Sequence, residues 1–432
     1  MTIVQQVHTL KGPLAATVAV PGSKSVANRA LVCAALAHGT SVLSNVPDGD
    51  DTVAMLRCLA GLGIGATLEA DRVTIGVSGQ LFHSATDMVH AGLAGTTSRF
   101  VTALAALGSM PIRIDGDPPL RGRPFGPLHD ALQQLGVVVT PGDSPGRLPV
   151  TVKGPPNKGT VRIRGDVSSQ FVTALMLIGP YLADGLRIEL TSRLVSRPYV
   201  DMTAAVMGWF GHDDISIDDG VIDDGVIVVG PGRYRPSVIA IEPDASSASY
   251  PLALAAVAGG SVHVPGLGLD ALQGDARFAD LLAEMGCSVV RTPDGVWVGR
   301  DLDQDLEGLD VDMADISDLV PTMAVVAAFA ASPSVIRGVG FIRDKESDRL
   351  GDLAAELRRA GVDIEETDDG LIVRPSLTSI HAAQLATHHD HRLAMAFGVL
   401  GSAVDGIVVE DPGVVTKSWP GFWSMLEAVG DG

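Results

Sequence analysis

An internal repeat constrains the fold of this chain more than any other feature of its sequence. Six segments each begin an apolar helix, and each is followed by a small-residue turn and a strand pattern. Their first residues lie 70 to 79 positions apart and are Arg29, Arg99, Gln170, Ser249, Pro321 and Arg392. Open solenoids usually repeat every 20 to 50 residues or so, and the longer period here predicts that each copy is a whole α/β subdomain.

A second helix follows in each copy, and in five copies it ends at a glycine before the next strand. A glycine in this place is the usual helix C-cap, because it accepts positive φ without a Cβ penalty. The sixth copy reaches its second helix at residues 419–429, and its strands are expected at residues 2–20. We therefore predict two three-repeat domains. One spans residues 22–239, and the other is discontinuous, with residues 1–21 and 240–432.

Composition excludes several classes of function. The chain has 432 residues and a formal net charge of −20, which argues against nucleic acid as a partner, because phosphate backbones require a basic surface. No signal peptide and no membrane span is predicted from its apolar runs. The three cysteines lie at no metal-ligand spacing, and we expect them to be reduced core residues of a cytoplasmic protein that binds no metal.

Residues 21–29, PGSKSVANR, form the most informative short segment. They place Lys24, Ser25 and Arg29 around a glycine-led helix start, directly after the strand pattern of residues 15–20. A helix N-terminus offers unpaired N–H groups and partial positive charge, so a hydroxyl and two cations beside it favour a phosphate or carboxylate ligand. A capped helix with solvated charges is the alternative, and the segment is not a Walker A loop.

The other repeat helices also begin with polar side chains. The residues at these starts are Gly95, Thr96, Thr97, Ser98, Arg99, Ser168, Ser169, Gln170, Asp244, Ser246, Ser247, Asp318, Asp390, His391 and Arg392. Singly these residues are ordinary caps. Six equivalent helices in two symmetric domains would nevertheless bring these ends toward a common interface, where helix dipoles and cations together make an anion-binding cleft.

Cations in loops add to this prediction. Arg121 and Arg123 lie in a Gly/Pro-stiffened loop, and Lys417 follows a strand pattern. Lys345 and Arg349 are four residues apart, on one helical face if a helix begins there. The intervening Glu346 and Asp348 are then available as their ion-pair partners.

Taken together, these motifs resemble the 5-enolpyruvylshikimate-3-phosphate synthase family over the whole chain. The motifs that carry the resemblance are, in order, PGSKSVANR, LAGTTSRF, RGRPF, GDVSSQFVTAL, SRPY, EPDASSASY, DKESDRL, DHRLAMAF and TKSWP. The resemblance implies an α/β fold of two similar domains, each an inside-out α/β barrel built from three βαβαββ repeats. It also implies a monomer that needs no cofactor.

The family transfers the enolpyruvyl group of phosphoenolpyruvate to the 5-hydroxyl of shikimate 3-phosphate and releases phosphate. By resemblance, the residues expected to hold shikimate 3-phosphate are Lys24, Ser25, Arg29, Ser168, Ser169, Gln170, Ser196, Asp318 and Lys345. Those expected to hold phosphoenolpyruvate are Lys24, Gly95, Arg123, Gln170, Arg349, Arg392 and Lys417. Asp318 is the candidate base at the 5-hydroxyl and Glu346 the candidate proton donor, with Lys24, His391 and Lys417 in support.

For each carboxylate a structural role is the alternative, a plain N-cap for Asp318 and an ion pair with Lys345 or Arg349 for Glu346. Two positions depart from the family pattern, because Leu93 and Phe341 stand where asparagine is common. The resemblance also implies that glyphosate competes with phosphoenolpyruvate, with Gly95 against that subsite.

Two other functions compete with this one. UDP-N-acetylglucosamine enolpyruvyl transferases share the fold, but they usually have Lys-Asn where this chain has Lys24-Ser25, and a cysteine in the loop that here spans residues 116–124 without one. A catalytically silent two-domain anion-binding protein is the second alternative.

Overall fold

The chain forms two compact units. The computed structural model describes residues 3–78, 86–218 and 225–430. One unit is continuous and spans residues 22–241, and the other is discontinuous and joins residues 1–21 to 242–432. We refer to them as the continuous unit and the discontinuous unit. The repeat had put the division after residue 239, and the chain leaves the continuous unit two residues later, after Ile241.

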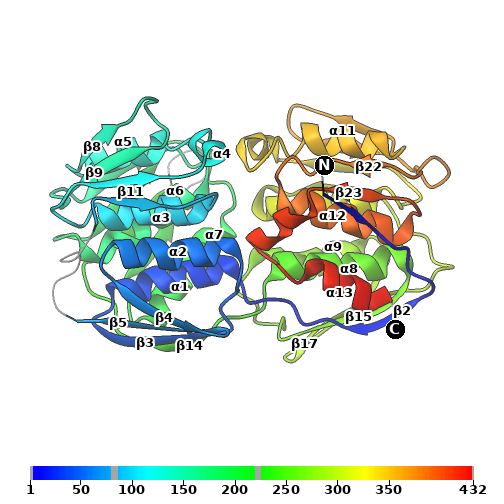
Figure 1. The fold of residues 1–432 in the computed structure, drawn as a ribbon, viewed down its shortest axis with the longest axis horizontal. Coiled ribbons are helices and arrows are strands. Elements are labelled where there is room, and N and C mark those ends of the chain that lie inside the picture. The colour runs from blue at the N-terminus through cyan, green and yellow to red at the C-terminus, as the bar shows by residue number, and fades with distance from the viewer. Residues whose placement is uncertain (1–2, 79–85, 219–224, 431–432) are drawn as a thin grey trace. The chain divides into compact units, whose positions relative to one another are not determined.

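In its described residues, the continuous unit has three four-stranded sheets (Figure 1). The first has the order β14 (Val238–Ala240), β3 (Gly39–Ser44), β5 (Arg72–Val77), β4 (Gly65–Glu69). The second has the order β6 (Met88–His90), β7 (Ile112–Asp115), β9 (Val150–Lys153), β8 (Val138–Pro141). The third has the order β10 (Thr160–Ile163), β11 (Leu186–Leu190), β13 (Val226–Val229), β12 (Ile215–Asp218).

Between residues 3 and 430, the described part of the discontinuous unit has two four-stranded sheets and one three-stranded sheet. The first has the order β2 (Leu14–Thr17), β15 (Gly260–Pro265), β17 (Gly295–Arg300), β16 (Ser288–Thr292). The second has the order β18 (Asp310–Asp312), β19 (Ser334–Arg337), β21 (Leu371–Val373), β20 (Ile364–Glu366). The third has the order β22 (Gln384–Leu385), β23 (Val408–Glu410), β1 (Val4–Gln6).

Every four-stranded sheet has the same pairing. Its first two strands are parallel, and the third strand is antiparallel to both of its neighbours. In the three-stranded sheet β22 is parallel to β23, and β1 from the N-terminal segment is antiparallel to it. The fold is therefore a mixed α/β fold, as the sequence predicts.

The helices of the continuous unit are α1 (Lys24–Leu36), α2 (Asp50–Gly61), α3 (Gly95–Ala105), α4 (Pro118–Arg121), α5 (Gly126–Gln134), α6 (Ser169–Ile178), the 3₁₀ turn η1 (Gly179–Tyr181) and α7 (Pro198–Trp209). Those of the discontinuous unit are α8 (Ala245–Ala258), η2 (Gly274–Arg277), α9 (Phe278–Glu284), η3 (Ala314–Leu319), α10 (Val320–Ala327), η4 (Gly340–Asp344), α11 (Gly351–Arg359), α12 (His391–Ala403), η5 (Pro412–Lys417) and α13 (Phe422–Gly430).

Three of these helices form the centre of each unit. Helices α1, α3 and α6 contact one another in the continuous unit, and α8, α10 and α12 do so in the discontinuous unit. In Figure 1, α1, α2 and α3 lie side by side. Nearly every residue of α8, α10 and α12 is buried, as expected for helices that are apolar on all sides. These six are the repeat helices of the sequence, and each begins up to five residues before the apolar segment that identified it.

The condition for a shared helical face of Lys345 and Arg349 is not met. Residues 345–350 do not belong to an α-helix, because η4 ends at Asp344 and α11 begins only at Gly351. Lys345 and Arg349 therefore do not share a helical face. Asp348 explains the late start, since its carboxylate accepts hydrogen bonds from the backbone N–H groups of Leu350 and Gly351 and so caps α11 from outside. Among the described residues, no helix is long and apolar enough to cross a membrane.

Candidate active site

The start of α1 is built as the sequence predicts. Ser23 is the N-cap, and its hydroxyl accepts a hydrogen bond from the N–H of Val26 at 3.3 Å. Lys24 follows as the first helical residue, and its Nζ lies 3.1 Å from Oδ2 of the buried Asp51 on α2. Asp51 thus holds the ammonium group of Lys24 near the helix start, a role that no sequence motif had indicated.

Arg29 lies one turn deeper and is 1% exposed. Its guanidinium donates to the carbonyl of Ser25 at 2.7 Å, to the hydroxyl of Thr203 at 2.9 Å and to the carbonyl of Tyr199 at 3.2 Å. Burial lowers the pKa of Arg29 to about 10. No carboxylate is paired with Arg29 among the residues that the structure describes, so its positive charge is held beneath the start of α1 by neutral oxygens alone.

The starts of α3 and α6 bring three further candidates together. Gly95 is the first residue of α3, and a Cβ at this position would lie 2.5 Å from Nη1 of Arg123. The Arg123 guanidinium thus packs directly on the Gly95 backbone. On α6, Gln170 accepts a hydrogen bond from Nη1 of Arg99 at 2.5 Å. Arg99, which the sequence marks at the second repeat-helix start, is buried with its guanidinium over the rings of Phe125 and Phe171.

The serine candidates occupy two kinds of position. Ser168 is the N-cap of α6, and its hydroxyl accepts from the N–H of Gln170 at 3.3 Å, with Ser169 buried as the first helical residue. Ser196 is buried just before α7 and has a left-handed backbone with φ of 54°. A non-glycine residue in this conformation is uncommon and often marks a functional position.

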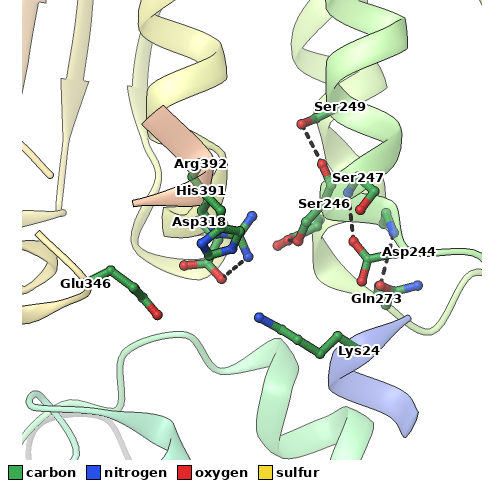
Figure 2. A network of polar contacts seen from close by, with 12 residues as sticks. Lys24, Asp244, Ser246, Ser247, Ser249, Gln273, Asp318, Glu346, His391 and Arg392 are labelled. Carbon is green, nitrogen blue, oxygen red and sulfur yellow. Dashed lines mark hydrogen bonds and ion pairs between the residues drawn. The ribbon is translucent and has the colours of Figure 1, made fainter. Parts of the chain in front are cut away.

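In the discontinuous unit, two arginines hold one carboxylate. Asp318 lies in η3, directly before α10, and its side chain accepts from Nη1 of Arg349 at 2.8 Å and from Nη2 of Arg392 at 2.6 Å. Figure 2 shows the ion pair between Asp318 and Arg392. The N-cap of α10 is Leu319, with no side-chain cap. The Asp318 side chain is therefore committed to two arginines and not to capping the helix.

Arg349 is the centre of this cluster and is 1% exposed. Besides Asp318, it donates to Oε2 of Glu346 at 2.7 Å and, through Nε, to Oδ2 of Asp390 at 2.6 Å. Glu346 also lies 4.0 Å from Nζ of Lys417. The sequence had left an ion pair with Arg349 open for Glu346, and the structure contains that pair.

The charges in this cluster shift one another strongly. Burial alone would raise the pKa of Asp318, but Arg392 and Arg349 outweigh it and hold that pKa far below its ordinary value. Burial alone would lower the pKa of Arg349, but Asp390, Glu346 and Asp318 hold it above its ordinary value. Without ligand, the acidic and basic groups of this cluster thus neutralise one another.

Two more predicted residues flank the cluster. His391 is the first residue of α12, is 1% exposed, and has Nδ1 3.5 Å from Oδ1 of Asp390. Lys345 holds its ammonium 5.7 Å from the centre of the Phe341 ring. Phe341 is one of the two departures from the family pattern, and here it supplies a cation–π contact in place of a polar side chain.

A second polar network of the discontinuous unit lies at the start of α8 (Figure 2). Asp244 caps α8 by accepting from the N–H of Ser247 at 2.7 Å, and Gln273 accepts from the N–H of Ala245 at 3.0 Å. The hydroxyl of Ser246 donates to Asp275, which is 3% exposed. Burial, with Asp318 nearby, raises the pKa of Asp275 to about 7.

Two acidic residues of these clusters, Asp51 and Asp275, were not predicted from the sequence, and Asp390 was a candidate only for its place at a helix start. Asp390 was visible in the sequence as a helix cap, and it does accept from the N–H of Arg392 at 2.9 Å. Its contact with Arg349 spans 41 positions and left no local signal. Within the described parts of the chain, no group of three acidic, histidine or cysteine side chains is arranged to hold a metal ion.

Comparison with known proteins identifies the family of the chain. Residues 9–426 match the family described as EPSP synthase (3-phosphoshikimate 1-carboxyvinyltransferase). The chain belongs to the EPSP synthase family. It is 41% identical over 424 residues to the 3-phosphoshikimate 1-carboxyvinyltransferase of a Nostoc species, an alignment that covers 97% of this chain and 98% of that protein. It is 38% identical over 416 residues to the Escherichia coli O6:H1 protein of the same name, with 96% of each covered.

Solved structures agree at the level of the fold. An EPSP synthase from Acinetobacter baumannii matches with a TM-score of 0.79 at 24% identity, over 99% of this chain and 98% of that one. The enolpyruvyl transferase NikO from Streptomyces tendae matches with a TM-score of 0.78 at 18% identity, over 99% of this chain and 97% of that one. At these identities the likeness concerns the fold alone.

Proposed function

We propose that this chain catalyses the reaction of its family, the transfer of the enolpyruvyl group of phosphoenolpyruvate to the 5-hydroxyl of shikimate 3-phosphate with release of phosphate. This is a transferase step of the shikimate pathway to aromatic amino acids. The observation that carries the proposal is the cluster of the discontinuous unit, in which the buried Arg349 pairs with both Asp318 and Glu346. Family membership supplies the substrates.

We assign phosphoenolpyruvate to the cations of that cluster. A planar carboxylate fits the paired N–H groups of an arginine, so the substrate carboxylate takes the place that Asp318 now occupies on Arg349 and Arg392. The remaining ligands proposed for this substrate are Lys24, Gly95, Arg123, Gln170 and Lys417. The contact of Arg123 with Gly95 and that of Arg99 with Gln170 support three of these residues, Gly95, Arg123 and Gln170, because both guanidinium groups lie against the start of a helix.

We assign shikimate 3-phosphate chiefly to the hydroxyls and cations of the continuous unit. Lys24 and Ser25 lie at the start of α1, where backbone N–H groups favour an anion. Arg29 adds positive charge that no carboxylate of its surroundings cancels. The remaining ligands proposed for this substrate are Ser168, Ser169, Gln170, Ser196, Asp318 and Lys345.

The chemistry requires that a proton leave the 5-hydroxyl and that another reach the methylene carbon of phosphoenolpyruvate. In the addition step, Asp318 takes the proton of the hydroxyl, whose oxygen bonds to the central carbon, while Glu346 gives a proton to the methylene. In the elimination step, that carbon loses phosphate, which takes the proton held by Asp318, and the methyl group returns its proton to Glu346. Lys417 and His391 stabilise the charges beside these carboxylates.

Asp318 is a poor base while two arginines depress its pKa. When the phosphoenolpyruvate carboxylate binds those arginines, the pKa of Asp318 rises toward the useful range. The proposal therefore couples binding of one substrate to the readiness of the base for the other.

The repeat architecture, the oligomeric state and the cellular location belong to the same proposal. We infer that each sheet with its helices is one copy of a βαβαββ unit, so that each unit of the chain is a three-copy inside-out α/β barrel. The shared pairing of the four-stranded sheets supports this. We further infer a monomer in the cytoplasm, which agrees with three buried free cysteines.

A coupled assay for phosphate release tests the function. Phosphate should appear only when phosphoenolpyruvate and shikimate 3-phosphate are both present, and Asp318→Asn should abolish most of it. Release with UDP-N-acetylglucosamine in place of shikimate 3-phosphate would favour the related transferase, and binding without release would favour the silent binding protein.

A further inference from the structure

The turn before α12 has an unusual backbone. His388 and His389 both have left-handed conformations, with φ of 50° and 60°. Two consecutive non-glycine residues in this region are rare, and such backbones persist where surrounding contacts over-determine them. The turn leads directly into Asp390, His391 and Arg392 of the site.

A buried carboxylate on α11 holds this turn. Glu356 is 2% exposed, and its Oε1 lies 3.1 Å from Nε2 of His388. Its Oε2 accepts from the N–H of Ala386 at 3.1 Å. Glu356 thus contacts the ring of His388, whose side chain is 33% exposed, and the guanidinium of Arg359, whose Nε lies 3.3 Å away and whose side chain is 61% exposed. Asp352 of α11 lies 3.5 Å from the other ring nitrogen of His388.

The turn connects this contact to the arginines. The N–H of Asp390 donates to the carbonyl of Thr387 at 2.8 Å, so the position of residues 387–388 fixes that of Asp390. Asp390 in turn accepts from Nε of Arg349 at 2.6 Å and from the N–H of Arg392 at 2.9 Å. Arg349 itself lies two residues before α11, the helix that carries Glu356.

The neighbouring His389 provides a natural contrast. Its Nδ1 lies 3.4 Å from Oδ2 of Asp411, but the two side chains are 77% and 51% exposed. Exposed ion pairs contribute little, because water screens them. His389 thus has the same left-handed backbone as His388, but its carboxylate partner is exposed, whereas Glu356 is buried.

We propose that His388 is a positioning residue that holds Asp390, and through it Arg349 and Arg392, in the arrangement that receives the phosphoenolpyruvate carboxylate. The inference rests on the proposed function for the role of the two arginines. His388 contacts neither of them and acts only through the turn and Asp390.

The test compares four single variants by steady-state kinetics and by hydrogen exchange of residues 385–392. His388→Asn keeps a residue that tolerates the left-handed backbone but is too short to reach Glu356. His388→Gln restores an N–H donor of greater reach, and Glu356→Gln weakens the partner while still accepting from Ala386. His389→Asn is the matched control at the exposed position.

We expect His388→Asn to raise the KM for phosphoenolpyruvate on the order of five-fold or more, and that for shikimate 3-phosphate by less. Hydrogen exchange of residues 385–392 should be faster in His388→Asn and Glu356→Gln than in the wild-type protein. His388→Gln should restore most of the wild-type phosphoenolpyruvate KM and exchange rate. His389→Asn should change neither the KM nor the exchange rate.

Unchanged exchange in His388→Asn would overturn the proposal, since the turn would then not depend on His388. Faster exchange with an unchanged phosphoenolpyruvate KM, or equal rises for both substrates, would also overturn it, because the contact would then serve folding alone. If the wild-type protein shows no turnover, the proposed function fails, and the exchange data still decide whether His388 holds the turn.

Discussion

The contact between Gly95 and Arg123 predicts the effect of the smallest side chain at position 95. In Gly95→Ala the added Cβ would lie 2.5 Å from Nη1 and 3.0 Å from Cζ of Arg123, where ordinary contacts begin near 3.4 Å. The guanidinium must therefore move by roughly 0.9 Å. Arg123 is only 8% exposed, so it moves by leaving its preferred rotamer, at a cost of about 0.5–1.5 kcal/mol. Since about 1.4 kcal/mol is a factor of ten, we expect phosphoenolpyruvate to bind roughly 2- to 13-fold more weakly.

The helix itself should not suffer, because alanine is a better helix former than glycine. Gly126→Ala is the matched control: Gly126 also opens a helix, and its Cβ would meet only the Cα of Gly146, at 3.8 Å. The assay varies phosphoenolpyruvate with and without glyphosate. We expect competitive inhibition in the wild-type protein and a rise in the glyphosate Ki of at least the same factor in Gly95→Ala. A KM and a Ki that match those of Gly126→Ala would refute the reasoning.

Three further outcomes follow from the cited contacts. Lys24→Met should nearly abolish turnover without unfolding the protein, and wild-type turnover would exclude Lys24 as a ligand. Asp318→Asn should lower kcat by about 10²–10⁴-fold and change KM far less, since a base acts mainly in the transition state; a raised KM with unchanged kcat would mean a role in binding only. Asp275 has a pKa raised from 3.8 to about 7, so its contribution to folding stability is complete below pH 4 and is lost as the pH rises to 7. Compared with Asp275→Asn, the wild-type protein should therefore lose thermal stability between pH 4 and 7, by up to about 4 kcal/mol; parallel pH profiles would contradict this.

Many of the candidate site residues could be proposed from the sequence because they lie at helix starts. The period of the repeat located α1, α3, α6, α8, α10 and α12, and the polar residues before each apolar run marked Lys24, Gly95, Ser168 and Arg392.

What the sequence did not reveal depends on contacts between distant segments. The pairing of Lys24 with Asp51, and of Arg349 with Asp390, joins residues with no common local pattern. The sequence left open whether a helix begins at Lys345, and it does not, because Asp348 accepts hydrogen bonds from the first N–H groups of α11 and the helix starts after Arg349. The sequence shows which charged side chains lie at helix starts, but it does not show which of them form ion pairs in the folded protein.

The identity of the product tests the central claim most directly. The wild-type protein is incubated with phosphoenolpyruvate labelled at the methylene carbon and with shikimate 3-phosphate, and the reaction is followed by carbon and phosphorus NMR. We expect the labelled vinyl group to reappear as an enol ether on the 5-oxygen, with one free phosphate for each group transferred. Labelled pyruvate with unmodified shikimate 3-phosphate would mean hydrolysis without transfer, and would contradict the account.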